Sequence, residues 1–106
     1  MKTLEEQLAA VRKDGYAIQF IDNPSLEVQL AAIQQYECAV YHIKNPFPEV
    51  QLAAVQKLGW AIRFIKDPSP EIQLAAVQQS GLAIRQIKKP TQEVLNYVKT
   101  LEVMSA

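Results

Sequence analysis

Residues 49–68 read EVQLAAVQKLGWAIRFIKDP, and this stretch decides the fold because the chain repeats it every 22 residues. The opening motif recurs as EEQLAAV from Glu5, EVQLAAI from Glu27, EIQLAAV from Glu71 and, in degenerate form, EVLNYVK from Glu93. A proline recurs with the same period, at Pro24, Pro46, Pro68 and Pro90. A fixed period of this kind is typical of one structural unit that stacks on its own copies and buries its apolar face against them.

Within one copy, the residue pattern predicts a helical hairpin. Pro48 stands at the first helical position, where its missing N–H is tolerated. The other copies place a capping hydroxyl before the helix, at Ser25, Ser69 and Thr91. Gly59 follows the apolar run and predicts a left-handed C-terminal cap. A second, shorter helix is then expected over residues 60–66, and it ends before Pro68 because the residue preceding a proline disfavours the helical region.

One copy departs from this pattern, since Glu37 stands where the other copies have Gly15, Gly59 and Gly81. The departure supports an alternative in which each copy is one continuous helix of about 18 residues with an apolar stripe on one face. A glycine in the middle of such a helix costs only about 1 kcal/mol, so it does not exclude the alternative. We favour the hairpin, and both versions are all-α.

The predicted fold is therefore all-α, a short α-solenoid of four 22-residue helical-hairpin repeats plus a C-terminal capping helix. The repeats cover about residues 4–25, 26–47, 48–69 and 70–91, and the cap covers 92–104. The last copy replaces Leu-Ala-Ala by Asn96-Tyr97-Val98, as expected of a terminal unit without a neighbour. With 106 residues, the chain is expected to form a single domain over 1–106.

The composition argues against several classes of protein. Eleven Lys and Arg residues balance eleven Asp and Glu residues, so the formal net charge is zero, whereas a general nucleic-acid or membrane-surface binder needs a basic excess. The single cysteine, Cys38, excludes an intramolecular disulfide and fits a reducing compartment. The apolar runs are too short for a secretory signal or a membrane helix. We therefore expect a cytoplasmic protein without a membrane partner.

The repeat E-V-Q-L-A-A-V-Q-x-x-G-x-A-I-x-x-I-K-x-P resembles a bacterial and phage repeat family of unknown function, built on Leu-Ala-Ala-Val, then Gly, then Ala-Leu/Ile. The similarity covers about residues 4–90, and the Glu37-Cys38 pair departs from it. The resemblance implies a helical repeat domain of the kind found in bacterial, phage and effector proteins. It implies no catalytic residue.

Columns that vary between copies are free to carry specificity, while the repeated Glu and Gln columns are expected to be architectural. At 100° per residue, three variable columns of the second helix share one arc, roughly opposite the Ala-Ile-Ile core stripe. Aromatic residues and arginine are the types that interface hot spots favour. The candidate partner-binding residues are Tyr16, Phe20, Tyr41, His42, Trp60, Arg63, Phe64 and Arg85. Two alternatives stay open at this point: a second buried layer, or the seam of a homodimer.

The sequence offers little that could support catalysis, a metal or a cofactor. Cys38 and His42 are four residues apart and would face the same side of an α-helix, but they make only half of a zinc site. The three glycines lie too far apart to form a phosphate loop. We therefore expect neither enzymatic activity nor a metal or cofactor site.

The chain is thus expected to be a non-enzymatic protein-binding repeat module. The family resemblance suggests, more narrowly, a phage or bacterial inhibitor or adaptor that binds a host protein. Between Arg63 and Lys89, five basic residues stand against two acidic ones. With Trp60 and Phe64 they could bind an acidic protein surface, a nucleotide or a single strand, or form a solvated rim. The alternatives are a nucleotide- or nucleic-acid-binding protein that uses the aromatic and arginine face, or a self-assembling structural element.

Overall fold

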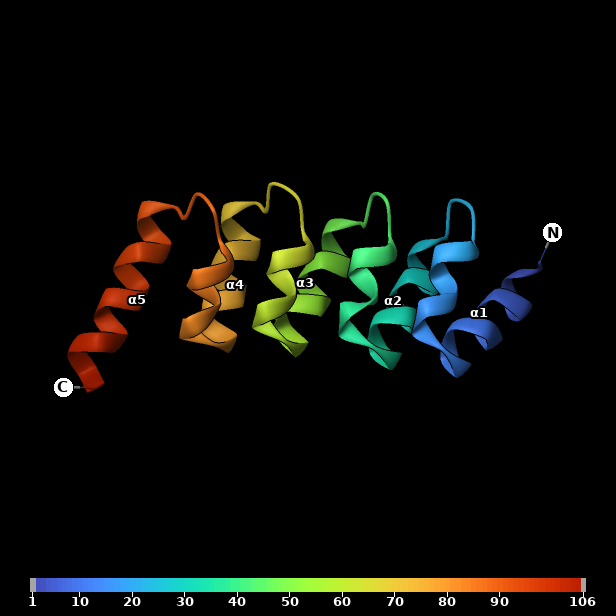
Figure 1. The fold of residues 1–106 in the computed structure, drawn as a ribbon, viewed down its shortest axis with the longest axis horizontal. Helices are drawn as coiled ribbons and strands as arrows, with labels where there is room; N and C mark the ends of the chain where they lie inside the picture. The colour runs from blue at the N-terminus through green and yellow to red at the C-terminus, as the bar shows by residue number, and fades with distance from the viewer. Residues whose placement is uncertain (1, 106) are drawn as a thin grey trace.

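The computed structural model describes residues 2–105, so residues 1 and 106 at the ends of the predicted domain lie outside the described residues. The described chain is all-α and elongated, with extents of 54 × 22 × 16 Å (Figure 1). The α-helices are α1 (Leu4–Lys13), α2 (Leu26–Gln35), α3 (Pro48–Lys57), α4 (Pro70–Gln79) and α5 (Gln92–Ser105). The 3-10 helices are η1 (Gly15–Phe20), η2 (Glu37–His42), η3 (Gly59–Phe64) and η4 (Gly81–Gln86). Four repeating α/η units followed by a C-terminal helix make a short solenoid.

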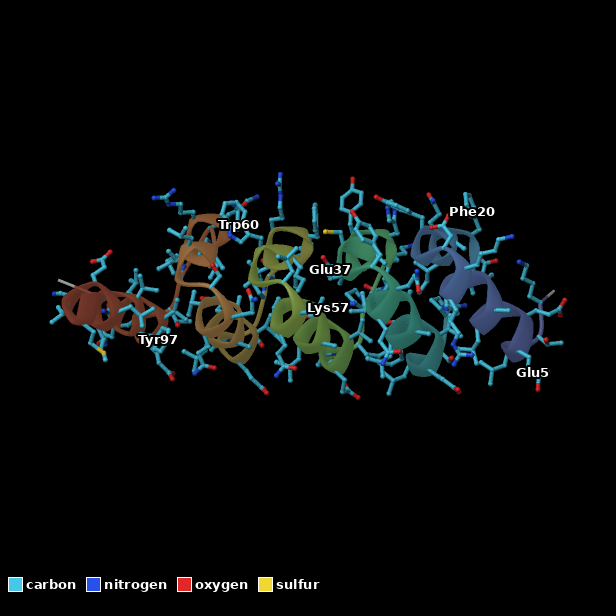
Figure 2. All side chains as sticks on the ribbon, turned by 90° about the horizontal axis from the view of Figure 1, so that it is seen from below. Glu5, Phe20, Glu37, Lys57, Trp60 and Tyr97 are labelled. Carbon is cyan, nitrogen blue, oxygen red and sulfur yellow. The ribbon has the colours of Figure 1, made fainter. Side chains whose placement is uncertain are left out.

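The units stack in two layers, one of α-helices and one of 3-10 helices (Figures 1 and 2). Each helix contacts its own partner and the helices of the neighbouring units, and the two termini lie at opposite ends of the array. The core between the layers consists mainly of alanine, valine and isoleucine side chains. Ala54 and Val55 of α3 and Ala61 of η3 have no exposed surface. Alanine at these positions allows the two backbones to approach closely, so the repeated motif specifies the stacking.

The predicted helix starts are confirmed. The hydroxyl of Ser25 accepts a hydrogen bond from the N–H of Val28 at 3.3 Å, and Ser69 caps α4 in the same way. Thr91 accepts from the N–H of Val94 at 3.2 Å. Pro48 is the first residue of α3, as its fixed φ angle favours.

The hairpin is also confirmed and the continuous helix is wrong, but the turn differs from the prediction. No described glycine has a positive φ angle, so the expected left-handed cap is absent from this part of the chain. One extended residue makes the turn instead, for example Leu58 with φ −148° and ψ 106°. Its N–H donates to the carbonyl of Ala54 and its carbonyl accepts from the N–H of Ala61, both at 2.9 Å. A single residue therefore closes the α-helix and opens the 3-10 helix.

At the start of η3, glycine is required for a different reason, namely the close approach of the next unit. A Cβ atom on Gly59 would lie 2.6 Å from the backbone oxygen of Ala76 and 2.9 Å from Oε1 of Gln79. The N–H of Gly59 also donates to that Gln79 oxygen at 2.7 Å. The end of α4 thus rests directly on the beginning of η3.

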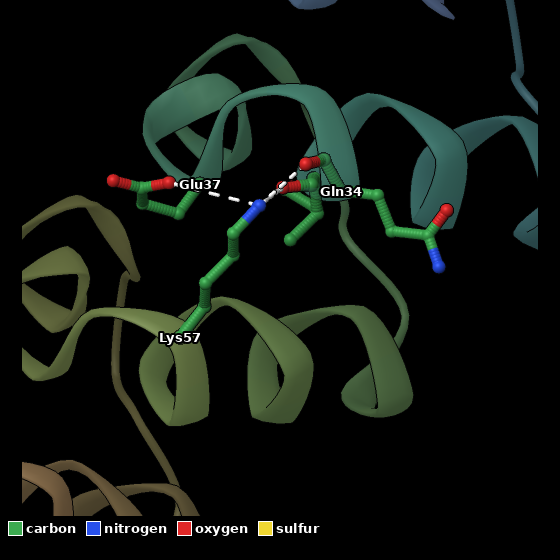
Figure 3. Close-up of polar contacts among 4 residues, drawn as sticks. Gln34, Glu37 and Lys57 are labelled. Carbon is green, nitrogen blue, oxygen red and sulfur yellow. Dashed lines mark hydrogen bonds and ion pairs between the residues drawn. The ribbon is translucent and has the colours of Figure 1, made fainter.

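The junction between the second and third units is built differently, because Glu37 occupies the glycine position there. Lys57 stands where the next unit has Gln79, and its Nζ donates to the carbonyls of Ile33 and Gln34 at the end of α2 (Figure 3). The same Nζ lies 4.0 Å from Oε2 of Glu37. Helices α2 and α3 contact each other less extensively than the α1–α2 and α3–α4 pairs do.

Glutamines of the repeated column fasten the loops, which confirms the architectural interpretation of that column. Gln73 is 5% exposed, and its Nε2 donates to the carbonyls of Pro68 at 3.2 Å and Lys89 at 3.3 Å. Its Oε1 accepts from the N–H of Thr91 at 3.0 Å. Gln29 makes the equivalent bonds to Pro24 and to the loop that follows η2. Each of these two side chains joins the loop before its own α-helix to the loop at the end of its own unit.

Candidate functional site

The predicted site residues lie on the outer side of the η layer. The second, fifth and sixth residues of each 3-10 helix are exposed or half-buried, whereas the third and fourth are buried or half-buried, and Phe64 also packs against the core. In η3, for example, Ala61 and Ile62 are 0% and 1% exposed. Phe20 and Tyr41, by contrast, are 82% and 65% exposed, so the alternative of a second buried layer is wrong for these two residues. The α layer covers only one side of the η layer, as Phe20 and Trp60 show in Figure 2.

The candidate residues differ in exposure, and we call the whole set the η face. Its exposed members are Tyr16, Phe20, Tyr41, Trp60, Arg63 and Arg85, and its half-buried members are His42 and Phe64.

Five members of the η face form one continuous row across the first three units. The ring of Tyr16 lies 5.0 Å from that of His42, edge to face. His42 lies 5.1 Å from Tyr41, and Tyr41 lies 5.3 Å from Phe64, again edge to face. The guanidinium of Arg63 lies 5.3 Å from the centroid of the Phe64 ring. These geometries are the favoured ones for aromatic and cation–π pairs, so the contacts hold the side chains in place.

The other members of the η face, Phe20, Trp60 and Arg85, stand apart from this row. Within residues 2–105, no ring contact or cation–π contact joins them to it. Phe20 in η1 and Trp60 in η3 add exposed apolar surface on the first and third units.

The sequence prediction missed Tyr36, the extended residue between α2 and η2. Its ring lies 4.8 Å from that of Tyr16, and the hydroxyl groups of the two tyrosines are hydrogen-bonded at 3.1 Å. The hydrogen bond to Tyr16, a further one to Cys38 and partial desolvation raise the pKa of Tyr36 above its ordinary value. Tyr36 belongs to a fourth variable column, directly before the glycine column, and the variability of that column was the signal that could have found it.

Cys38 and His42 do not share one side of their helix as expected. In a 3-10 helix, residues three apart are eclipsed and residues four apart are offset by about 120°. Cys38 is half-buried and interacts with Tyr36, whereas His42 packs between Tyr16 and Tyr41. Among the described residues, no group of three or more histidine, cysteine, aspartate or glutamate side chains is placed to hold a metal ion.

Two grooves follow the edge of the array where the loops join each 3-10 helix to the next α-helix. The larger, of about 630 Å³, lies between η3 and η4 and the loops after them. Its walls include Arg63, Lys66, Lys88 and Lys89, together with Tyr41 and Phe64. The structure therefore brings together four of the five basic residues singled out in the sequence. Arg85 and Trp60 do not line this groove.

The second groove has a volume of about 580 Å³ and lies between η1 and η2 and their loops. It contains His42 and Gln19 at positions that correspond to Gln86 and Arg63 of the larger groove.

Comparison with known proteins finds no match to a family model, to a curated protein or to a solved structure. The chain is a regular array of helix and 3-10 helix units that repeat about every 22 residues, and no family is identified. The resemblance suggested by the repeat motif thus stays a prediction. None of the helices in the described part of the chain is long and apolar enough to cross a membrane.

Proposed function

We propose that this chain is a non-enzymatic protein-binding repeat module that contacts its partner through the η face. The observation that carries the proposal is the row of contacting rings on the outer side of the 3-10 helices, with Tyr41 at 65% exposure in its centre. Tyrosine, tryptophan and arginine dominate the residues that contribute most to protein interfaces. A solvated aromatic row of this composition matches such an interface.

The packing of the rings against each other supports the same proposal. Binding is weakened by the entropy lost when surface side chains become ordered. In the row, His42 packs against both Tyr16 and Tyr41, so these rings have lost part of that freedom before any partner arrives. The buried glutamines Gln29 and Gln73 hydrogen-bond the loops that join the units. The mechanism of action is then surface complementarity on a preorganised scaffold, without turnover.

A narrower version of the proposal follows from the family resemblance alone. A short repeat array similar to phage and bacterial repeat domains would act as an inhibitor or adaptor that binds a bacterial protein in the cytoplasm. The neutral net charge favours a protein partner over a nucleic acid, because nucleic-acid binding draws most of its affinity from excess positive charge.

Photo-crosslinking tests the assignment of the face. A photoreactive phenylalanine analogue is placed at Phe20 or Tyr41, and at the exposed control positions Gln56 and Gln78 of the α layer. In lysate of the source cells, both η-face positions should give the same discrete adduct and the control positions should not. The triple variant with alanine at Trp60, Arg63 and Arg85 should lose the adduct while it folds normally. Equal crosslinking from both layers, or full retention by the triple variant, would refute the proposal.

A second copy of the chain is the competing protein partner, and the same experiment separates it. An adduct with twice the mass of the chain would indicate a homodimer seam, and sedimentation of the purified protein would then show a concentration-dependent dimer. A salt-sensitive adduct with nucleic acid would favour the nucleic-acid alternative, because such binding weakens steeply as salt rises.

A further inference from the structure

We propose that the groove between η3 and η4 binds a short acidic peptide segment of a partner protein. The inference rests on the proposed function and specifies the chemistry of one part of the contact. Arg63 is the fifth residue of η3, and Lys66 follows in the loop after that helix. Lys88 and Lys89 lie in the loop after η4. All four line the same groove, and Asp67 is the one carboxylate in its wall.

The cations of this groove are not neutralised within the protein. Among residues 2–105, the structure contains one ion pair, between Lys57 and Glu37, and it lies outside the groove. Four cations and one carboxylate leave an excess of three positive charges at one site of an otherwise neutral chain. Like charges held close together raise the local potential, and a bound anion lowers it. The arrangement therefore favours an anionic ligand.

The groove between η1 and η2 provides an internal comparison. It is built from the positions that lie two repeats, or 44 residues, earlier in the chain. The replacements are Gln19 for Arg63, Asp22 for Lys66 and Asn45 for Lys89, while Lys44 corresponds to Lys88. That groove therefore carries one lysine and one aspartate and has no excess charge. Because the two grooves are built from equivalent positions of the repeat, the fold does not require the basic residues of the groove between η3 and η4.

The surroundings of the groove favour a short peptide over a nucleic-acid strand. The positive charge is local: the first turns of α4 and α5 carry Glu71 and Glu93, and the groove between η1 and η2 has no net charge, so the array offers no continuous basic track for a strand. The guanidinium of Arg63 lies over one face of the Phe64 ring, 5.3 Å from its centroid. Tyr41 and Phe64 offer apolar contact to a peptide side chain, and Arg63 is suited to a carboxylate.

The test uses the full chain and a fluorescein-labelled glutamate-rich peptide with one central phenylalanine, followed by fluorescence anisotropy at low salt. The wild type should bind one peptide, and a lysine-rich peptide of the same length should not bind. The variant Arg63→Gln/Lys66→Asp/Lys89→Asn introduces the residues of the groove between η1 and η2. It should weaken peptide binding at least about tenfold. All three side chains are exposed, so this variant should keep the wild-type melting temperature.

The reciprocal variant Gln19→Arg/Asp22→Lys/Asn45→Lys introduces the basic residues into the groove between η1 and η2. It should raise the stoichiometry to two peptides per chain. Unchanged peptide binding by the first variant would overturn the inference. Tighter binding of an oligonucleotide or of ATP than of the peptide, lost in the same variant, would also overturn it. A crosslinked partner that persists while the peptide fails to bind would refute the groove alone, whereas peptide binding without any crosslinked partner would refute the proposed function.

Discussion

Replacing Gly59 by alanine tests whether the close approach of neighbouring units, and not the turn, demands glycine in this array. The added Cβ would lie 2.6 Å from the backbone oxygen of Ala76, and backbone can give way only if α4 moves. It would also lie 2.9 Å from Oε1 of Gln79 and push away the acceptor of the Gly59 N–H. The substitution therefore creates a clash and removes a hydrogen bond from a buried donor.

The expected loss of stability follows from these two contacts. Overpacking of this kind costs about 1–3 kcal/mol, and an unsatisfied buried N–H costs about 1 kcal/mol more. Alanine also lowers the conformational entropy of the unfolded chain, which increases stability by about 0.4–1 kcal/mol where the native backbone conformation is allowed. It is allowed here because Gly59 has no positive φ angle. The net destabilisation of Gly59→Ala is about 2 kcal/mol, which corresponds to a drop in melting temperature of roughly 10 °C.

Gly81→Ala is the matched control, because Gly81 has the same position in its 3-10 helix. There the nearest atom to an added Cβ is Cδ1 of Leu101 at 3.2 Å, the end of a flexible side chain. The free energy of unfolding should stay within about 0.5 kcal/mol of the wild type. Urea and thermal unfolding followed by circular dichroism measure both variants. Equal losses for the two substitutions, or a neutral Gly59→Ala, would show that neighbour contact is not the reason for glycine.

Three further predictions concern the loops and the titratable groups. Gln73→Leu should lower the free energy of unfolding by about 2–3 kcal/mol, because it leaves buried polar groups of the loops unpaired. Gln51→Leu loses one hydrogen bond to the Pro46 carbonyl and should lower it by about 1 kcal/mol. Urea titration measures both variants. The N-cap backbone N–H of α1 lowers the pKa of Glu6, so its contribution to stability should disappear as the pH falls below about 4.5, and Glu6→Gln should flatten this dependence in thermal melts. The pKa of Tyr36 is raised, so its effect on stability has the opposite pH dependence. Its contribution to the free energy of unfolding should be complete below pH 10.0 and lost as the pH rises above it, and Tyr36→Phe should remove that loss.

The period of the sequence determines most of the architecture. Stacked helical hairpins follow from the 22-residue repeat, and the caps at Ser25, Ser69 and Thr91 follow from local propensity. The outward direction of the variable columns follows from the alternation of buried and variable residues, because Ala61 and Ile62 must face the α layer whichever helix type carries them. These features depend on patterns within one copy or on comparison between copies.

Features that depend on contact between units were not predictable in the same way. A six-residue segment has nearly the same apolar pattern in an α-helix and a 3-10 helix, so the helix type and the offset between Cys38 and His42 were missed. The groove between η3 and η4 needs the loops of two units, and Tyr36 joins the aromatic row through Tyr16 of the preceding unit. Each of these is set by a distance across the array that one copy of the repeat does not contain.

The exceptional second unit shows that the residues of neighbouring copies are matched to each other. The turn before Glu37, at Tyr36 with φ −159° and ψ 111°, has the same extended geometry as the turns before glycine, so a side chain there strains no backbone. What changes is the residue that faces it twenty positions later. Gln79 approaches Gly59 and accepts from its N–H, whereas Lys57 approaches Glu37 and donates to the end of α2. Glu37 is tolerated because the third unit places the long, positively charged side chain of Lys57 opposite it and because α3 packs less extensively on α2. The departure of the second unit from the glycine pattern is therefore matched by a change in the unit that faces it.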